Sequence, residues 1–381
     1  WRPGPAWAPP AGRPRAAMGA ALAGPVTAKE SGDGLSREAR LAWGFSCMQG
    51  WRNRMEDAHF CLPDLPACAA PGQLGWTGTA LFGVLDGHGG DQVALFCERH
   101  LPAAIAHGPP SDVSGALTAA FHRMDEMLAD PAGLEEMTTM TQALSGFQPS
   151  PEHSGCTAVV CCIRQDSIVV ANAGDSRAVL CRRGKAIDLS EDHKPNLPQE
   201  LARITRAGGR IVEQRTLGPT QYRVNGNLNL SRSIGDLGYK KQSQLPPEDQ
   251  IICCTPDVQT IRRHADDEFL VLACDGVWDV LSSQEVVDFL RPHLTSAGAA
   301  SAAAWEPSEA RLSLLLESLL DRCLSPDLVQ TRGLGGDNMT VVVVQFLRED
   351  ARSCGDDDQS DRGDARDGAV GLGSSWLCPS R

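Results

Sequence analysis

Short apolar runs rich in β-branched residues recur along this chain, and several of them stand directly beside an aspartate. Four acids occupy such strand-end positions: Asp86 in TALFGVLDGHGG, Asp175 in IVVANAGDSR, Asp275 in FLVLACDGVWD and Asp337 in GDNMTVVVV. Apolar runs of this length and composition predict buried strands. The chain is therefore predicted to fold around sheets whose strand ends carry acidic side chains.

The wider pattern predicts a mixed protein of class α+β. Strands are predicted over 80–85, 156–163, 168–173, 178–181, 269–274 and 340–346. Helices are predicted over 92–105, 113–128, 198–207, 283–290 and 312–323. Tight turns at 173–177 and 182–185 favour hairpins and an antiparallel sheet over βαβ repeats. Helices are therefore expected to cover antiparallel sheets.

Composition excludes several functional classes. The 381 residues are 42% hydrophobic and 22% charged, which excludes collagen, coiled coil and wholesale disorder. A formal net charge of -13 argues against nucleic acid or an anionic membrane as a partner. The 14 cysteines include no CxxC pair, which excludes a zinc ribbon and predicts reduced thiols inside the cell. The apolar runs have strand length, so no transmembrane segment is predicted.

The strand-end acids are predicted to meet at one sheet edge. In an antiparallel sheet the end of one strand lies beside the start of its neighbour, so Asp86, Asp275 and Asp337 can share an edge. Clustered carboxylates raise one another's pKa unless cations neutralise them, and an all-oxygen set favours Mg²⁺ or Mn²⁺ over zinc. For any one acid, an ordinary Asp-Gly turn is the alternative. Four acids at strand ends in one chain, taken together, favour a metal site over ordinary turns.

Two further side chains would suit phosphoryl transfer at such a site. Arg52 could hold phosphate oxygens in a bidentate manner, and His88 could protonate a departing alkoxide. Taken alone, each has a simpler interpretation, since Arg52 could be a surface cation and His88 a loop histidine bonded to the backbone.

The motifs taken in order resemble those of the metal-dependent type 2C (PPM family) serine/threonine protein phosphatases. They span about residues 41–347 and comprise MQGWRNRMEDAH (48–59), LFGVLDGHGG (81–90), SGCTAVV (154–160), NAGDSRAVL (172–180), EDHKP (191–195), ELARITRAGG (200–209), NGNLNLSRSIGDLGYK (225–240), PDV (256–258), FLVLACDGVWDVL (269–281) and GDNMTVVVV (336–344). A whole series in register is far more specific than any single motif.

The resemblance implies a fold, a metal centre and a set of residue roles. The fold would be a four-layer αββα sandwich, in which two antiparallel sheets are flanked by helices. A binuclear Mg²⁺ or Mn²⁺ centre would lie at one edge, with a weaker third ion in some relatives. The implied metal residues are Asp86, bridging both ions; Gly87, through its carbonyl; Asp275 and Asp337; Glu56 and Asp57, mainly through water; and Asp175 and Asp279, for the third ion. Arg52 would hold phosphate and His88 would be the general acid.

Some segments depart from the family pattern. The usual SRA triplet is here Ser231, Arg232 and Ser233, a change expected to affect packing more than chemistry. An extra polar stretch at 215–222 falls in the region of the family's flap, where substrate choice could differ. The stretches 130–153 and 295–305 are interpreted as loop insertions without a recognisable motif.

The predicted organisation is one catalytic domain with two tails. Residues 1–37 are predicted to be a disordered Pro/Ala/Gly-rich segment, 38–347 the catalytic domain and 348–381 a disordered acidic tail. If translation began at Met18, Ala23 would stand where N-myristoylation needs Ser or Thr, so lipid anchoring is not expected. The working compartment is expected to be the cytoplasm, the nucleus or both.

The hypothesis from sequence is a protein-serine/threonine phosphatase. It would hydrolyse phosphoserine and phosphothreonine of other proteins by attack of metal-activated water, without a covalent intermediate, and is expected to be a monomer. Cysteine has no role, because no HCx5R-like loop is present. The alternative is a catalytically inactive type 2C-like scaffold, which loss of metal acids would favour, although none is lost. A small phosphorylated metabolite as substrate is a further alternative.

Overall fold

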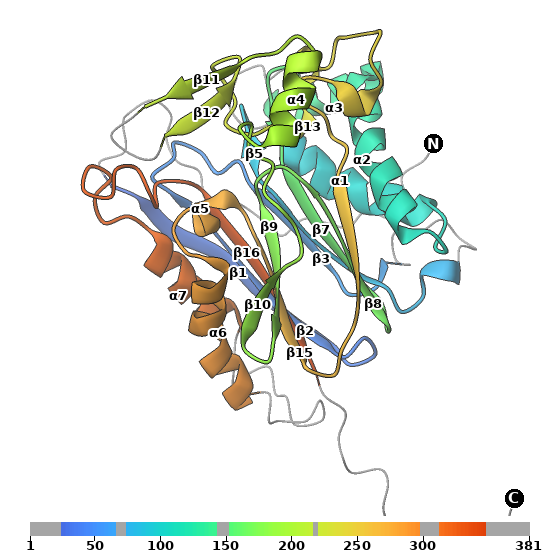
Figure 1. Cartoon of the computed structure of the whole chain (residues 1–381). Helices are drawn as coiled ribbons and strands as arrows, with labels where there is room; N and C mark the ends of the chain where they lie inside the picture. Colours follow the sequence, from blue (N-terminus) through green and yellow to red (C-terminus); the bar gives the residue numbers. More distant parts are fainter. Residues whose placement is uncertain (1–23, 66–73, 143–151, 216–219, 298–311, 348–381) are drawn as a thin grey trace, which may run out of the picture. The chain divides into compact units, whose positions relative to one another are not determined.

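Two antiparallel sheets face each other, and helices cover their outer surfaces (Figure 1). The computed structural model describes residues 24–65, 74–142, 152–215, 220–297 and 312–347. The predicted αββα architecture is confirmed. The predicted tail 348–381 and most of the predicted N-terminal segment lie outside the described residues.

The first sheet has six strands in the order β1-β2-β16-β15-β9-β10. Their bounds are β1 Val26–Ser36, β2 Leu41–Gly50, β16 Met339–Phe346, β15 Asp267–Ala273, β9 Arg177–Arg182 and β10 Lys185–Asp188. The second sheet has five strands in the order β14-β8-β7-β4-β3. Their bounds are β14 Asp257–Arg262, β8 Ser167–Ala173, β7 Ala158–Ile163, β4 Ala80–Leu85 and β3 Ala58–Leu62.

The sheets pack through alternate side chains of their buried strands. On β4, Phe82 and Val84 point between the sheets, whereas Leu81 and Leu85 point toward the helices. The same alternation places Val342 and Val344 of β16 in the layer between the sheets. Because successive strand residues point to opposite faces, an entirely apolar strand is what a sheet buried on both sides requires.

Helices form the two outer layers. On the five-stranded sheet lie α1 (Gln92–His107) and α2 (Val113–Ala129), whose apolar residues share a core with β4 and β7. On the six-stranded sheet lie α5 (Asp275–Trp278), α6 (Ser283–Ala297) and α7 (Leu312–Cys323). Within the described ranges, no helix combines the length and the apolar character needed to cross a bilayer.

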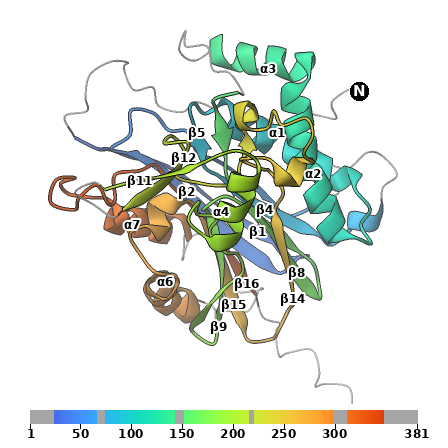
Figure 2. The same cartoon turned by 45° about the horizontal axis from the view of Figure 1, so that its top comes forward.

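Smaller elements gather at one end of the sandwich (Figure 1, Figure 2). They are helix α4 (Pro198–Arg206), the hairpin of β11 (Ile211–Gln214) and β12 (Gln221–Val224), and a small sheet of β13 (Ile234–Gly235), β6 (Gly155–Cys156) and β5 (Gly87–His88). Short 3-10 turns cover Leu74–Trp76, Leu237–Tyr239 and Pro247–Asp249.

The predicted start of the domain was placed too late. Val26–Ser36 form strand β1, although 1–37 was predicted to be disordered, and β1 pairs with β2 along its length. The segment has two glycines and few apolar residues, so composition alone indicated no strand. Its glycines lie opposite Trp43 and Phe45, and these rings supply the contacts that the strand's own side chains do not.

Two local predictions were also wrong. The stretch 130–153 contains helix α3 (Pro131–Gln142), which the Asp130 carboxylate caps by accepting from the Ala132 amide at 2.9 Å. The turn at 173–177 does not form a hairpin, because it carries the chain from β8 in one sheet to β9 in the other. The turn at 182–185 does join the paired strands β9 and β10. Residues 143–151, 216–219 and 298–305 of the predicted insertions lie outside the described residues.

Candidate metal centre and active site

Acids from both sheets gather at the end of the sandwich that carries the small sheet. Asp86 follows β4 of the five-stranded sheet, whereas Asp275 follows β15 and Asp337 precedes β16 of the six-stranded sheet. Because β15 and β16 are antiparallel neighbours, their acids emerge at the same edge. Asp175 lies in the connection that crosses between the sheets.

These carboxylates lie close enough to shift one another's ionisation. Burial and the charges of Asp57, Asp275 and Asp337 raise the pKa of Asp86 well above its ordinary value. Burial and the charges of Asp175 and Asp337 likewise raise the pKa of Asp275. Among the described residues, neither Asp86 nor Asp275 forms an ion pair with a Lys, Arg or His side chain. The arrangement is therefore costly unless cations enter it, and its oxygen donors fit Mg²⁺ or Mn²⁺.

The segment before β3 brings two further acids to the centre. The Asn338 side chain holds this segment, since its Oδ1 accepts from the Glu56 amide at 2.9 Å and its Nδ2 donates to the Arg54 carbonyl at 2.9 Å. Asp57 is buried, and its Oδ2 accepts from the Thr340 hydroxyl at 2.7 Å. A side chain at Gly87 would place its Cβ 2.2 Å from the Glu56 carbonyl oxygen, so only glycine allows this close approach.

A thiol also borders the acids. One potential ligand atom from each of Asp57, Asp86 and Cys274 lies within 4.8 Å of the other two. Burial and the neighbouring carboxylates raise the pKa of Cys274 well above its ordinary value, so the thiol is held in its neutral form. Cys274 had been given no role from sequence, and its position follows from preceding Asp275 directly.

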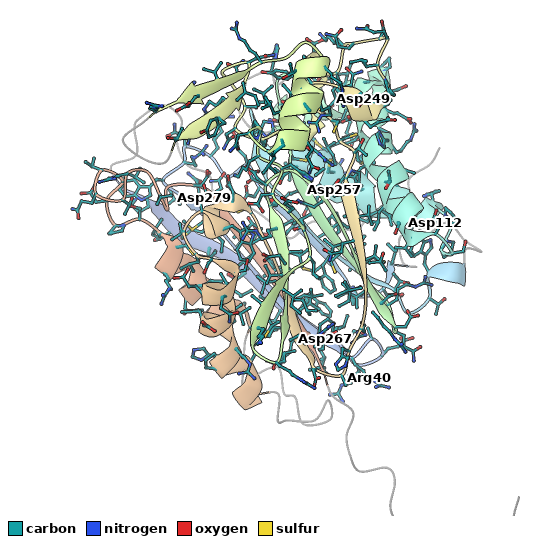
Figure 3. All side chains as sticks on the ribbon, in the orientation of Figure 1. Arg40, Asp112, Asp249, Asp257, Asp267 and Asp279 are labelled. Carbon is teal, nitrogen blue, oxygen red and sulfur yellow. The ribbon has the colours of Figure 1, made fainter. Side chains whose placement is uncertain are left out.

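Two cations sit at the rim of the cluster. Arg52 donates to Asp337 at 2.5 Å, and Lys194 donates to Asp175 at 2.6 Å. Burial alone would lower the pKa of Arg52, but the charges of Asp337, Asp275 and Asp86 outweigh it and raise that pKa. Asp279 follows α5 with an exposed side chain at this same end of the sandwich, whereas Asp267 lies at the opposite end (Figure 3).

His88 has a carboxylate partner that sequence reasoning missed. Its Nε2 lies 2.7 Å from Oδ2 of Asp236, a residue that is 1% exposed. Burial lowers the pKa of His88, but the charge and hydrogen bond of Asp236 outweigh it and raise that pKa. The only signal was the Gly-Asp pair in SRSIGD, and β13 is two residues long, so no apolar run marked it as a strand end.

The fold and the acid cluster together define the class: an αββα sandwich with carboxylates from both sheets at one edge. The family model of protein phosphatase 2C matches residues 41–325. Asp337 lies beyond that match. The chain therefore belongs to the protein phosphatase 2C family.

Relatives and solved structures agree with this assignment. The chain is 40% identical over 365 residues to "Probable protein phosphatase 2C 11" of Oryza sativa subsp. japonica, covering 87% of this chain and 91% of the relative. It is 42% identical over 334 residues to "Protein phosphatase 2C homolog 2" of Schizosaccharomyces pombe, covering 87% and 79%. A crystal structure of a phosphatase from a pathogenic strain of Toxoplasma gondii aligns with a TM-score of 0.61 over 86% of this chain and 98% of that chain. At 22% identity, that last likeness shows the fold alone.

Proposed function

We propose that this member of the protein phosphatase 2C family hydrolyses phosphoserine and phosphothreonine in other proteins, using two Mg²⁺ or Mn²⁺ ions. The observation that carries the proposal is the pair Asp86 and Asp275, whose pKa values are raised by desolvation and by neighbouring carboxylates and which form no ion pair with a Lys, Arg or His side chain among the described residues. An acid cluster of this kind is costly to the fold, which is expected where function requires it.

The residues proposed to hold the ions are those at the sheet edge. Asp86, the Gly87 carbonyl, Asp275 and Asp337 would be direct ligands, and Glu56 and Asp57 would act mainly through water. Asp175 and Asp279 would serve a weaker third ion. When bound, such ions would activate water and offset charge on the phosphoryl oxygens.

Arg52 is proposed to hold the phosphate group. Its side chain is 59% exposed, and its ion pair with Asp337 keeps the guanidinium beside the acid cluster. A guanidinium offers two parallel donors to phosphate oxygens, which both orients the group and stabilises its charge during transfer. Partial exposure leaves donors available for a substrate.

His88 is proposed to protonate the departing serine or threonine oxygen. Its side chain is 23% exposed, and Asp236 engages Nε2, so the ring is held in one orientation while remaining accessible. Proton donation of this kind is worth roughly 10²–10⁴ in rate when the leaving group is an alkoxide.

Metal dependence separates this function from that of an inactive scaffold. We expect the purified chain to release phosphate from a phosphothreonine peptide in Mn²⁺, to stop when EDTA is added, and to resume when Mn²⁺ is restored. Parallel assays on phosphorylated metabolites would show whether proteins are the preferred substrates. Metal binding seen by calorimetry without turnover of any phosphoester would instead support the scaffold.

A further inference from the structure

The loop that carries Asp236 is fixed from the side by helix α2. On this helix, Asp125 accepts from the Gly235 amide at 2.8 Å through Oδ1 and from the Lys240 ammonium at 2.6 Å through Oδ2. Lys240 also donates to the Ser233 carbonyl at 2.8 Å. The Asp125 and Lys240 side chains are only 15% and 8% exposed, so both ends of the loop are held by one buried ion pair.

Ser233 holds the carboxylate itself. Its hydroxyl donates to Asp236 Oδ2 at 2.6 Å, and this is the same oxygen that contacts His88 Nε2. Ser233 is fully buried, and its amide is bound by the Cys253 carbonyl at 3.0 Å. The hydroxyl therefore has a fixed position from which to orient the carboxylate. This is the position at which the chain departs from the alanine that the family resemblance leads one to expect, and the serine hydroxyl adds a hydrogen bond to Asp236 that alanine could not make.

The backbone around this contact leaves little freedom. In the small sheet, His88 and Gly235 pair with Gly155 from opposite sides. A Cβ at Gly155 would lie 2.4 Å from Asp236 Oδ2. The Asp236 carboxylate can therefore occupy its place beside His88 only because residue 155 has no side chain. Asp236 also adopts a left-handed conformation with φ of 50°, which needs support from its neighbours.

We propose that Ser233 and the Asp125–Lys240 pair are positioning residues, which hold the Asp236 carboxylate where it orients the His88 ring toward the leaving group. Helix α2 would thereby contribute to phosphate-ester hydrolysis without touching substrate or metal. The inference rests on the proposed function, because it concerns how the proposed general acid is aimed. It adds Ser233, Asp125 and Lys240 to the residues that set the rate.

The choice of leaving group gives a specific readout. A serine or threonine alkoxide needs a proton as it departs, whereas p-nitrophenolate is stable enough to leave without one. A ring that is misaimed should therefore slow hydrolysis of a phosphopeptide much more than hydrolysis of p-nitrophenyl phosphate. Loss of metal or of folded protein would slow both substrates alike.

The experiment measures kcat and KM of full-length variants on both substrates in Mn²⁺. For Asp125→Asn we expect kcat on a phosphothreonine peptide to fall roughly tenfold, because misplacing a catalytic group by a fraction of an ångström is costly. For Ser233→Ala we expect a fall of roughly fivefold by the same reasoning. KM on the peptide and kcat on p-nitrophenyl phosphate should each stay within about twofold of the wild type, since neither depends on ring orientation.

Matched control variants separate an effect on the orientation of the His88 ring from a general effect on folding. Glu126→Gln removes a carboxylate that pairs with Arg123 on the exposed face of the same helix. Ser46→Ala removes another fully buried hydroxyl, bonded to Ser31 in the β1–β2 pair. Neither should change the ratio of the two activities. In an Asp236→Asn background, Ser233→Ala should add no further selective loss, since residues that act through one partner are not additive.

Two results would overturn the inference: an unchanged ratio of the two activities in both the Asp125 and the Ser233 variants, or full additivity of Ser233→Ala with Asp236→Asn. Wild-type activity keeps this failure distinct from failure of the proposed function. A wild type that hydrolyses neither substrate overturns the phosphatase proposal, whereas an active wild type with ratio-neutral variants overturns only the positioning role.

Discussion

Two acidic sites in this molecule differ in whether side chains of the chain offset their negative charge. At helix α4, Glu200 is 1% exposed and accepts from Arg203 at 2.7 Å, from Arg232 at 2.7 Å and from the Ser231 hydroxyl at 2.6 Å. Burial acts to raise its pKa, but the hydrogen bond from Arg232 and the charges of both arginines outweigh burial and lower the pKa to about 2. The chain supplies this acid with its own cations.

At the sheet edge, Asp86 and Asp275 have no ion pairs of this kind among the described residues. Asp86 and Asp275 are surrounded by other carboxylates, and the nearby cations Arg52 and Lys194 pair with Asp337 and Asp175 instead. Both pKa values are raised, in contrast to that of Glu200. A buried charge is tolerated only when it is paired, so the two sites differ in where the pairing cation comes from. The Glu200 site is complete within the chain, whereas the site at the sheet edge is proposed to take its cations from solution.

The largest expected effect tests the incomplete site. Asp86→Asn or Asp275→Asn should reduce phosphatase activity in Mn²⁺ by roughly 10³-fold or more, because each removes a proposed metal ligand that no neighbour can replace. Steady-state assays on a phosphopeptide measure the loss. Asp249→Asn is the control, since Asp249 is a surface acid that faces Arg206 at 3.6 Å (Figure 3). Near-normal turnover in either cluster variant would contradict the metal-centre assignment.

The second prediction tests the complete site. Glu200→Gln should lower the free energy of unfolding by about 3–5 kcal/mol at neutral pH, because it leaves two buried arginines without their shared carboxylate. Urea unfolding measures the change. Glu268→Gln is the control, since Glu268 pairs with Arg291, which is 42% exposed, and should cost much less. An equal loss in both variants would remove the distinction drawn for Glu200.

Acid titration of the same site gives a signed expectation. The Glu200 pKa is about 2 in the folded chain against a reference of 4.5, so its contribution is present above about pH 4.5 and is lost as pH falls toward 2. The shift corresponds to about 3 kcal/mol at 1.36 kcal/mol per pKa unit. Glu200→Gln should flatten this part of the stability profile. An unchanged slope in the variant would show that other groups cause the acid loss.

Much of the fold could be predicted because its signals are local. Strand β4 and helix α7 have the predicted bounds, since an apolar run or a 3.6-residue period is visible without the rest of the chain. The crossing at 173–177 could not be predicted, because a turn signal does not say which sheet receives the next strand. Strand β1 was missed because its stability comes from the aromatic rings of its partner strand.

The residues of the candidate site likewise include some that local sequence signals predict and others that only tertiary contacts bring into place. The acids Asp86, Asp275 and Asp337 could be predicted, because each stands at the end of a strong strand signal. Asp236 could not, because its place beside His88 depends on a two-residue strand and a left-handed turn. Ser233 and Asp125 were also missed as contributors, since their partners are set by tertiary contacts and not by spacing.

Metal addition should change the free energy of unfolding by less than Glu200→Gln does and by more than Asp257→Asn does. At neutral pH the metal-free protein is expected to gain about 2.7 kcal/mol when Mn²⁺ is present at 100 times its dissociation constant, by mass action alone. Thermal unfolding followed by calorimetry measures the gain. Asp275→Asn should show less of it, whereas Glu200→Gln should keep the full increment despite its lower starting stability. Loss of the increment in the Glu200 variant would mean that the two sites are not independent.

The smallest expected effect lies at the outer end of the Glu200 network. Asp257 accepts from Arg232 at 2.7 Å and faces His193 at 3.1 Å, and its side chain is 54% exposed. The hydrogen bond from His193, followed by the charge of Arg232, lowers its pKa despite burial. Water screens an acid this exposed, so Asp257→Asn should cost only about 0.5–1 kcal/mol in urea unfolding. Asp321→Asn is the control, because Asp321 is 58% exposed and pairs with Lys29 outside the network. If Asp257→Asn cost as much as Glu200→Gln, burial would not be what separates the strong pairings of this chain from the weak ones.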